Sequence, residues 1–155
     1  FLQSYTANAD SSVAIPMFVS ATYTDATLTS PLSSGGEGDI LAADVPGATI
    51  PYVPEWKFSV GAGLSAENWG LSAIGSYRSD MYASAKNLEV SNGREGKIDG
   101  GFILDLSAHY KLSDTTRLIG GVHNVLDEVL TVSRLPDGPR ANAPREFYIG
   151  FELQW

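Results

Sequence analysis

The sequence predicts an all-β chain whose antiparallel strands form part of a transmembrane β-barrel. Apolar and polar residues alternate with a period of two along several stretches. The connections between these stretches alternate between short and long, as in barrels with tight turns at one rim and longer loops at the other. The expected strands have roughly 12 to 16 residues, more than the roughly 5 to 6 usual in soluble proteins. A soluble sandwich would also explain the alternation of apolar and polar residues, but it does not require short and long connections to alternate.

Composition excludes several other classes of protein. The chain of 155 residues has the length of one ordinary domain, and its 43% hydrophobic and 18% charged residues exclude a disordered tail. A net charge of −8 argues against a nucleic-acid partner, and the absence of cysteine excludes disulfides and thiolate metal sites. No apolar run reaches the roughly 18 residues of a membrane-spanning helix. Because Phe1 is not an initiator methionine, we expect the chain to have been processed or cut from a longer protein.

The first half of the chain contains one strand end and three further expected strands. A polar turn from Asn8 to Ser12 follows the first of them, and a loop rich in proline and glycine spans residues 29–51. A two-residue turn at Glu67 and Asn68 would pair Leu64 with Leu71 and Phe58 with Tyr77, which keeps apolar residues opposite apolar ones. The expected strands are residues 1–5, 13–28, 52–66 and 69–82.

The second half contains three more expected strands, at residues 102–112, 116–131 and 143–155, separated by a tight turn at 113–115 and a loop at 132–142. The first of these is the most regular alternation in the chain, and it follows a loop at residues 83–97. The last strand carries a wholly apolar face that suits contact with lipid. That face consists of Phe147, Ile149, Phe151, Leu153 and Trp155.

Three segments near the C-terminus carry a family resemblance. They are DLSAHYKL at residues 105–112, LIGGVHNVLD at 118–127 and APREFYIGF at 143–151. Together they resemble the C-terminal end of the TonB-dependent outer-membrane receptors, which often show D-L-x-A-x-Y, G-V-x-N-L-F-D and P-R-x-x-x-x-G motifs. Val125 and Leu126 stand where that family usually has Leu-Phe, a conservative apolar change. Residues 132–150 are most similar to the ferric-citrate type of receptor.

The resemblance implies that residues 1–155 are the C-terminal portion of a larger barrel of about 22 strands with a plugged lumen. This chain would supply about six to seven strands, and the plug domain and the TonB-contacting segment would lie upstream of it. The protein would lie in the outer membrane of a Gram-negative bacterium. Its partners would be lipid, lipopolysaccharide, TonB and the barrel-assembly machinery, for which the C-terminal strand would be the signal.

The implied function is active, TonB-driven uptake of a ferric chelate, either ferric citrate or another ferric siderophore. The resemblance implies neither an enzyme nor a resident cofactor. A passive porin-like or small structural barrel is the alternative. A third possibility is an outer-membrane enzyme that uses Asp105, His123 or a loop serine.

Five cations in two long loops are candidates for binding an anionic chelate, because guanidinium groups fork onto carboxylates. Alternatively, they brace the loops against Glu95, Asp137 and Glu146 or contact lipopolysaccharide phosphates. The five are Lys86, Arg94, Arg134, Arg140 and Arg145.

Asp105 falls opposite His123 on the polar faces of neighbouring strands, which predicts a hydrogen-bonded pair in the lumen. His109 with Asp105 lacks a third convergent ligand, so no metal site is expected. Turn-forming hydrogen bonds explain Asn124 and Asp127. The aromatic residues are expected to form a girdle at the membrane interface, and stacking on a ligand is the alternative. They are Trp56, Trp69, Tyr77, Tyr82, Tyr110 and Trp155.

Overall fold

The computed structural model describes residues 2–10, 13–31, 39–42, 46–90, 93–135 and 138–154, with the backbone alone for 2–10. Its main feature is one antiparallel sheet of seven strands, and the described residues contain no helix. Two short ribbons lie in the long connections, β5 (Met81–Tyr82) with β6 (Lys97–Ile98) and β9 (Thr131–Ser133) with β10 (Arg140–Ala141). The strands of the main sheet are β1 (Leu2–Asp10), β2 (Val13–Tyr23), β3 (Trp56–Ala66), β4 (Trp69–Arg78), β7 (Gly101–Lys111), β8 (Thr116–His123) and β11 (Glu146–Leu153).

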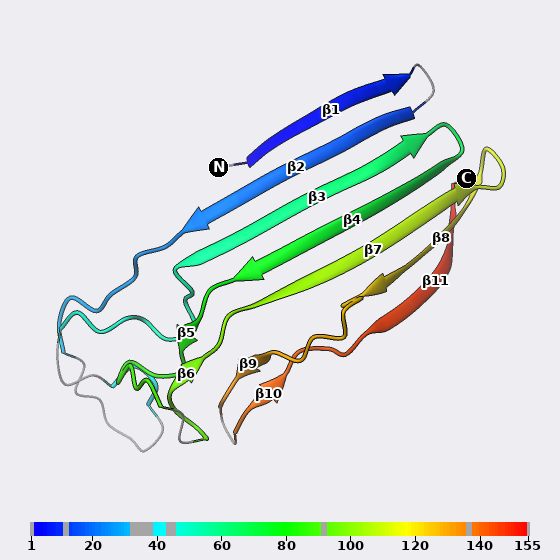
Figure 1. Ribbon diagram of the computed structural model, residues 1–155. Helices are drawn as coiled ribbons and strands as arrows, with labels where there is room; N and C mark the ends of the chain where they lie inside the picture. The colour runs from blue at the N-terminus through cyan, green and yellow to red at the C-terminus, as the bar shows by residue number, and fades with distance from the viewer. Residues whose placement is uncertain are drawn as a thin grey trace.

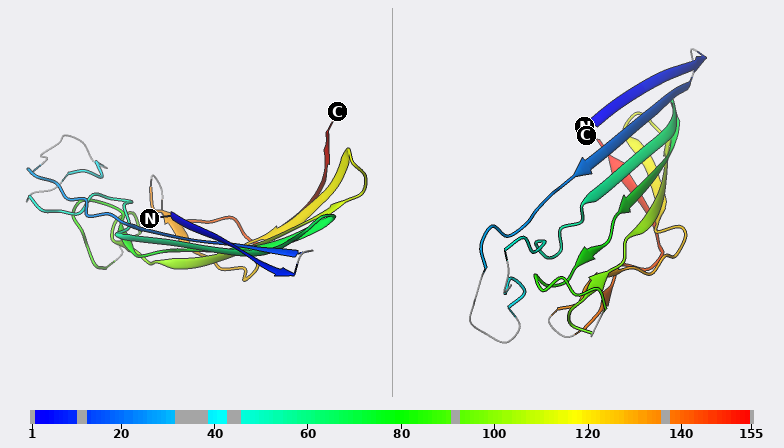
Figure 2. Two further views of the ribbon diagram at one scale, coloured as in Figure 1. Left: turned by 90° about the horizontal axis from the view of Figure 1, so that it is seen from above. Right: turned by 60° about the vertical axis from the view of Figure 1, so that its left-hand side comes forward.

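The sheet is an open, curved wall rather than a closed barrel. Its strands follow one another in chain order, with short turns gathered at one end and long loops at the other (Figure 1). We call these the turn end and the loop end. Seen from above, the sheet bends into a trough, with β1 at one edge and β11 at the other (Figure 2). The expected all-β segment of a larger barrel, with short and long connections at opposite ends, is confirmed. No helix in the described part of the chain is long and apolar enough to cross a membrane.

Neither face of the sheet is covered by a second layer of the described chain. The predicted register of β3 and β4 is confirmed, because Phe58 pairs with Tyr77 and Leu64 with Leu71. This register places apolar side chains on one face, which we call the apolar face, yet Val60 is 52% exposed and Ile149 is 79% exposed. The buried hydrophobic side chains of the described residues lie instead in the loops and their short ribbons, and they are Ala48, Met81, Ala83, Ala85 and Ile98. A sandwich would bury the apolar face, whereas a membrane wall exposes it to lipid.

The strands are shorter than the sequence predicted. β2 ends at Tyr23 and not near residue 28, and β4 ends at Arg78 and not near residue 82. β3 begins at Trp56 and not at residue 52, where Tyr52 has a φ of 60°, and β8 ends at His123 because Asn124 has a φ of 51°. Positive φ values cannot continue a strand. In the main sheet, the six strands β2, β3, β4, β7, β8 and β11 have 8 to 11 residues, close to the roughly 9 to 11 needed by a tilted transmembrane strand.

The expected turn at residues 8–12 was also placed too early. Asn8 pairs with Ala14 and Asp10 with Val13, with an irregular register between them. β1 therefore extends to Asp10, and only Ser11 and Ser12 of the expected turn fall outside the described residues. The asparagine and aspartate have turn-forming side chains, but strand pairing with β2 overrides that local preference.

On the opposite, polar face, rings lie over glycines of the neighbouring strand. The ring of Phe18 lies against Gly61, the imidazole of His109 against Gly70, and the phenol of Tyr148 against Gly121. A Cβ atom at Gly121 would overlap both the Tyr148 side chain and the backbone oxygen of Leu106. The glycines therefore allow large side chains to lie flat on the wall.

Replacing Gly121 with alanine is expected to lower the free energy of unfolding by about 1–3 kcal/mol, the usual cost of overpacking a close contact. The cost arises because the backbone oxygen of Leu106 cannot move away as a flexible side chain can. Gly150→Ala is the matched control, since its Cβ would meet Ile119 at an ordinary 3.6 Å. Urea unfolding of both variants in lipid vesicles measures the difference. Equal stabilities would contradict the close packing at Gly121.

Candidate functional site

The polar face carries short cross-strand contacts between β4, β7, β8 and β11. The hydroxyls of Ser72 and Ser107 lie 2.6 Å apart. Asp105 and His123 lie on adjacent strands with Oδ2 and Nδ1 3.7 Å apart, and His123 stacks on Tyr148 with ring centroids separated by 5.0 Å. The predicted juxtaposition of Asp105 and His123 is therefore present. Glu146 pairs with His123 in the register, but the described residues contain no group of three such side chains able to hold a metal ion.

Asp105 also fixes the point where β8 ends. Its Oδ1 accepts a hydrogen bond of 2.8 Å from the backbone nitrogen of Asn124. Asn124 is buried and has positive φ, a conformation that asparagine tolerates better than most residues. The carboxylate of Asp105 therefore anchors the first residue of the last long loop. Asp105 thus has a structural role in addition to any role inside the barrel.

Asparagine and aspartate side chains close the base of that last loop, a region that we call the loop neck (Asn124, Asp127, Asn142 and Arg145). The Asn124 amide donates to the backbone oxygens of Glu128 and Ala143 and accepts from the nitrogen of Glu128. Asp127 accepts from the backbone nitrogen of Arg145 at 3.0 Å and pairs with its guanidinium at 3.4 Å. Asn142 accepts from the nitrogen of Leu130. These bonds join the two stems of the loop before the β9–β10 ribbon begins.

The three long connections contact one another at the loop end. Asn87 exchanges two hydrogen bonds with the backbone of Thr49, and the backbone nitrogen of Tyr52 donates to the oxygen of Tyr82. The hydroxyl of Tyr52 also accepts from the backbone nitrogen of Arg134, which is 82 positions away. Two small apolar clusters support these bonds, one of Leu28, Ala48 and Ala85 and one of Tyr52, Met81, Ala83 and Ile98. The described parts of the loops are therefore linked to one another.

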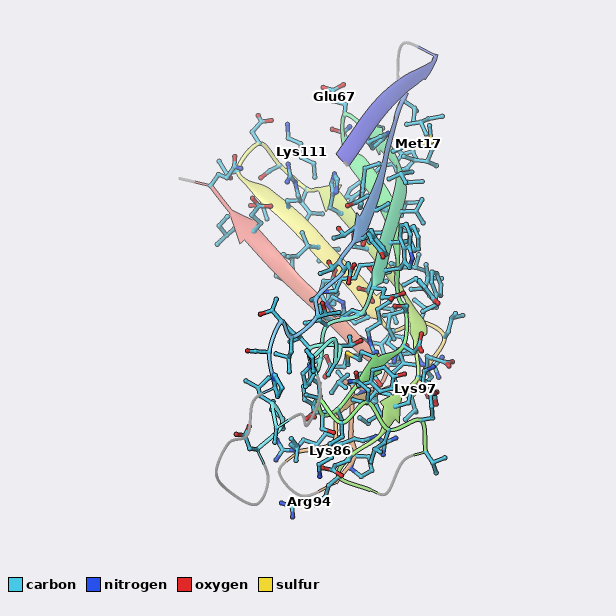
Figure 3. All side chains as sticks on the ribbon, turned by 90° about the vertical axis from the view of Figure 1, so that its left-hand side faces the viewer. Met17, Glu67, Lys86, Arg94, Lys97 and Lys111 are labelled. Atoms are coloured by element: carbon cyan, nitrogen blue, oxygen red, sulfur yellow. The ribbon has the colours of Figure 1, made fainter. Side chains whose placement is uncertain are left out.

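The five candidate cations are distributed over these loops. Lys86 pairs with Glu95 at 2.7 Å, which is one of the bracing contacts considered from the sequence, and Arg94 lies on the same loop (Figure 3). Arg134 donates to the backbone oxygen of Lys97 at 3.3 Å. Arg145 belongs to the loop neck, where its partner is Asp127 rather than Glu146, and Arg140 is exposed on β10. Asp137, the third expected bracing partner, lies outside the described residues.

Lys97 forms a charged cluster that was not predicted from the sequence. Its ammonium lies 2.6 Å from Asp80 and 3.5 Å from Glu89, and the hydroxyl of Tyr82 donates to Glu89 at 2.5 Å. The hydrogen bond from Tyr82 lowers the pKa of Glu89 from its ordinary value, and the hydrogen bond to Asp80 raises the pKa of Lys97. Tyr82 therefore lies in a loop network, so its predicted place in the aromatic girdle is wrong. The reason is that the strand ends at Arg78, four residues earlier.

Other aromatic residues form two bands on the apolar face. At the loop end, Tyr23, Trp56, Phe58 and Tyr77 follow one another with centroid separations of 4.8, 5.4 and 6.1 Å. At the turn end, Trp69 pairs with Tyr110 across β4 and β7. Trp155 lies outside the described residues. Aromatic bands at both ends of an exposed apolar wall are the arrangement of an outer-membrane β-barrel, since these rings suit the membrane interface.

Comparison with a family model identifies the kind of barrel. Residues 4–125 match the model described as TonB dependent receptor-like, beta-barrel, which covers more than half of the chain. The chain therefore belongs to the TonB-dependent receptor β-barrel family. A comparison with curated protein sequences finds no significant match.

Solved structures share the fold. The unliganded ferric citrate transporter FecA superposes with a TM-score of 0.70 and 20% identity, covering 90% of this chain and 21% of FecA. The siderophore receptor PiuA of Acinetobacter baumannii gives a TM-score of 0.71 at 14% identity, covering 98% of this chain and 21% of PiuA. The ferric enterobactin receptor PfeA of Pseudomonas aeruginosa gives 0.58 at 15% identity, with 98% and 21% coverage. The chain thus spans about a fifth of the length of each of these three proteins.

Proposed function

We propose that this chain is the C-terminal part of the barrel of an outer-membrane receptor that imports a ferric chelate with energy delivered through TonB. The observation that carries the proposal is the family match over residues 4–125. The exposed apolar face and its two aromatic bands support a place in the outer membrane of a Gram-negative bacterium. Transport and ligand reception, rather than catalysis, are the activities of such a receptor.

In this proposal, residues 1–155 supply the last strands of the barrel, while a plug domain and a TonB-contacting segment belong to other parts of the protein. The loop end faces the exterior, where it meets the ligand and lipopolysaccharide. The turn end faces the periplasm. The exposed apolar residues Phe147, Ile149, Phe151 and Leu153 of β11, followed by Trp155, serve as the signal for the barrel-assembly machinery.

A ferric siderophore is the proposed class of ligand, because the similar structures are named as ferric citrate, siderophore and ferric enterobactin receptors. Ferric citrate is the narrower candidate. Among the loop cations, Arg140 is exposed on β10 and is a candidate for contact with an anionic chelate, and the exposed Lys86 and Arg94 belong to one neighbouring loop. Arg134 and Arg145 would have to bind the ligand in addition to their backbone and carboxylate contacts.

Uptake of radioactive iron from ferric citrate tests this function in cells whose own chelate receptors have been deleted. Cells that express the complete receptor are expected to accumulate iron above the background of cells that lack it, and deletion of TonB should abolish the gain. A panel of catecholate and hydroxamate chelates then identifies the ligand. Accumulation that persists without TonB would support a passive porin-like barrel and contradict active transport.

A further inference from the structure

Two cations lie directly opposite each other on the polar face, close to the loop end. Lys57 of β3 pairs with Arg78 of β4 in the register, next to the pair of Phe58 and Tyr77 on the apolar face. Directly opposed residues share a face, with Cβ atoms about 4.5–5.5 Å apart, and like charges in such positions destabilise a sheet. Negative charge close to the pair would offset this repulsion.

No carboxylate of the described residues provides that compensation. Among the described residues, five other lysines and arginines form the ion pairs that the structure shows, whereas neither Lys57 nor Arg78 forms one there, even though Glu55 precedes Lys57 by two positions. Acidic residues are not scarce, because the chain has 18 of them against 10 basic ones. The nearest carboxylate along β7 on the same face is that of Asp105. It lies four residues from Gly101, which is paired with Arg78, and four residues of a strand span about 13 Å. The paired cations are Lys86, Lys97, Lys111, Arg117 and Arg145.

The Arg78 guanidinium is held in place but only partly satisfied. Its Nη2 donates to the backbone oxygen of Thr131 at 2.7 Å, whereas Nη1 is buried and has no hydrogen-bond partner. Arg134, three residues after Thr131, likewise has a buried Nε without a partner. A buried donor without an acceptor destabilises the folded state, because the donor has lost its hydrogen bond to water. An oxygen acceptor at this place would remove that destabilisation, and the exposed Lys57 lies beside it.

We propose that Lys57 and Arg78 form a binding site for an oxyanion, a carboxylate or phosphate group of a small ligand that enters from the loop end. Lys57 supplies a mobile ammonium, and Arg78 supplies a guanidinium whose orientation is fixed by Thr131. The identification of this oxyanion with a carboxylate of the transported chelate rests on the proposed function. The oxyanion site itself rests on the register and the unpaired donors.

Binding of inorganic phosphate and of citrate to the complete receptor, purified in detergent, tests the site by isothermal titration calorimetry. Because a hydrogen bond to a charged group is stronger than one between neutral groups, a single Lys57→Gln variant is expected to bind citrate about tenfold more weakly or worse. The Lys57→Gln, Arg78→Gln double variant should bind more weakly still, whereas Lys57→Arg should retain binding. Lys111→Gln is the matched control, since Lys111 is on the same face at the turn end and pairs with Asp114 at 2.8 Å.

The results of these titrations distinguish a bound ligand from a carboxylate of the protein itself as the source of the negative charge. Unchanged affinity in the double variant would overturn the site. A second result would also overturn it: the wild type binds neither phosphate nor citrate, and the double variant unfolds at a lower temperature in anion-free buffer. In that case a carboxylate from elsewhere in the protein would neutralise the pair. Loss of anion binding in the double variant supports the site even if the wild type fails to import ferric citrate, a failure that would count against the proposed function alone.

Discussion

Replacing Val60 with arginine is expected to lower the free energy of unfolding by about 2–4 kcal/mol, the cost of a cationic side chain on the lipid face near the bilayer midplane. Val60 lies near the middle of β3 and is exposed on the apolar face between the two aromatic bands. Arginine there would place its charge in hydrocarbon. Urea unfolding of the complete receptor in lipid vesicles measures the effect.

Ser59→Arg is the matched control, one residue earlier on the same strand and at almost the same depth. Ser59 pairs with Ser76 on the polar face, where an arginine can reach water. We therefore expect a cost of less than about 1 kcal/mol for this variant, as for most substitutions at solvated positions. A similar loss of stability in both variants would show that the two faces of β3 meet the same environment, contrary to the barrel-wall interpretation.

Replacing Asn124 with alanine is expected to cost roughly 2–4 kcal/mol, because it leaves several backbone groups of the loop neck without partners. The lost bonds join the side chain to Glu128 and Ala143, and alanine is also disfavoured at a φ of 51°. Hydrogen exchange of the β9 and β10 amides should accelerate together with the loss of stability. The loop would then move relative to the wall.

Two further variants isolate the cause of that change. Asn124→Gly accommodates the positive φ but lacks the side-chain bonds, so it should recover only the part of the loss due to backbone conformation. Asn68→Ala changes an exposed asparagine in the turn between β3 and β4 and should leave the exchange of β9 and β10 unaltered. Unchanged exchange in Asn124→Ala would contradict the role of the loop neck.

Local patterns in the sequence were sufficient to predict how strands pair in the wall of the barrel. The two-residue turn at Glu67 and Asn68 correctly predicted the pairing of Phe58 with Tyr77, and the period-two pattern correctly placed Asp105 beside His123. Both follow from alternation and turn length, which depend on residues close together in the sequence. The resemblance to TonB-dependent receptors was confirmed by the family match over residues 4–125, which ends before the last of the three C-terminal motifs.

The strand ends and the loop contacts could not be predicted in the same way. β8 looks continuous to residue 131 in the sequence, but the positive φ at Asn124 depends on bonds with Ala143 across the loop. The contact of Arg78 with Thr131 joins residues 53 positions apart, and that of Tyr52 with Arg134 joins residues 82 apart. Such contacts depend on how the loops fold over one another, and no periodicity encodes them.

The central claim is that one face of this sheet contacts lipid while the other faces the lumen, and a spin-label scan of β7 tests it most directly. This chain contains no cysteine, so once any cysteine elsewhere in the receptor is replaced, single cysteines at positions 102 to 106 can each carry one label in the receptor reconstituted in vesicles. We predict that oxygen, which partitions into lipid, relaxes labels at Phe102, Leu104 and Leu106 more strongly, whereas a water-soluble nickel chelate relaxes those at Ile103 and Asp105. Accessibility without this alternation would contradict the claim.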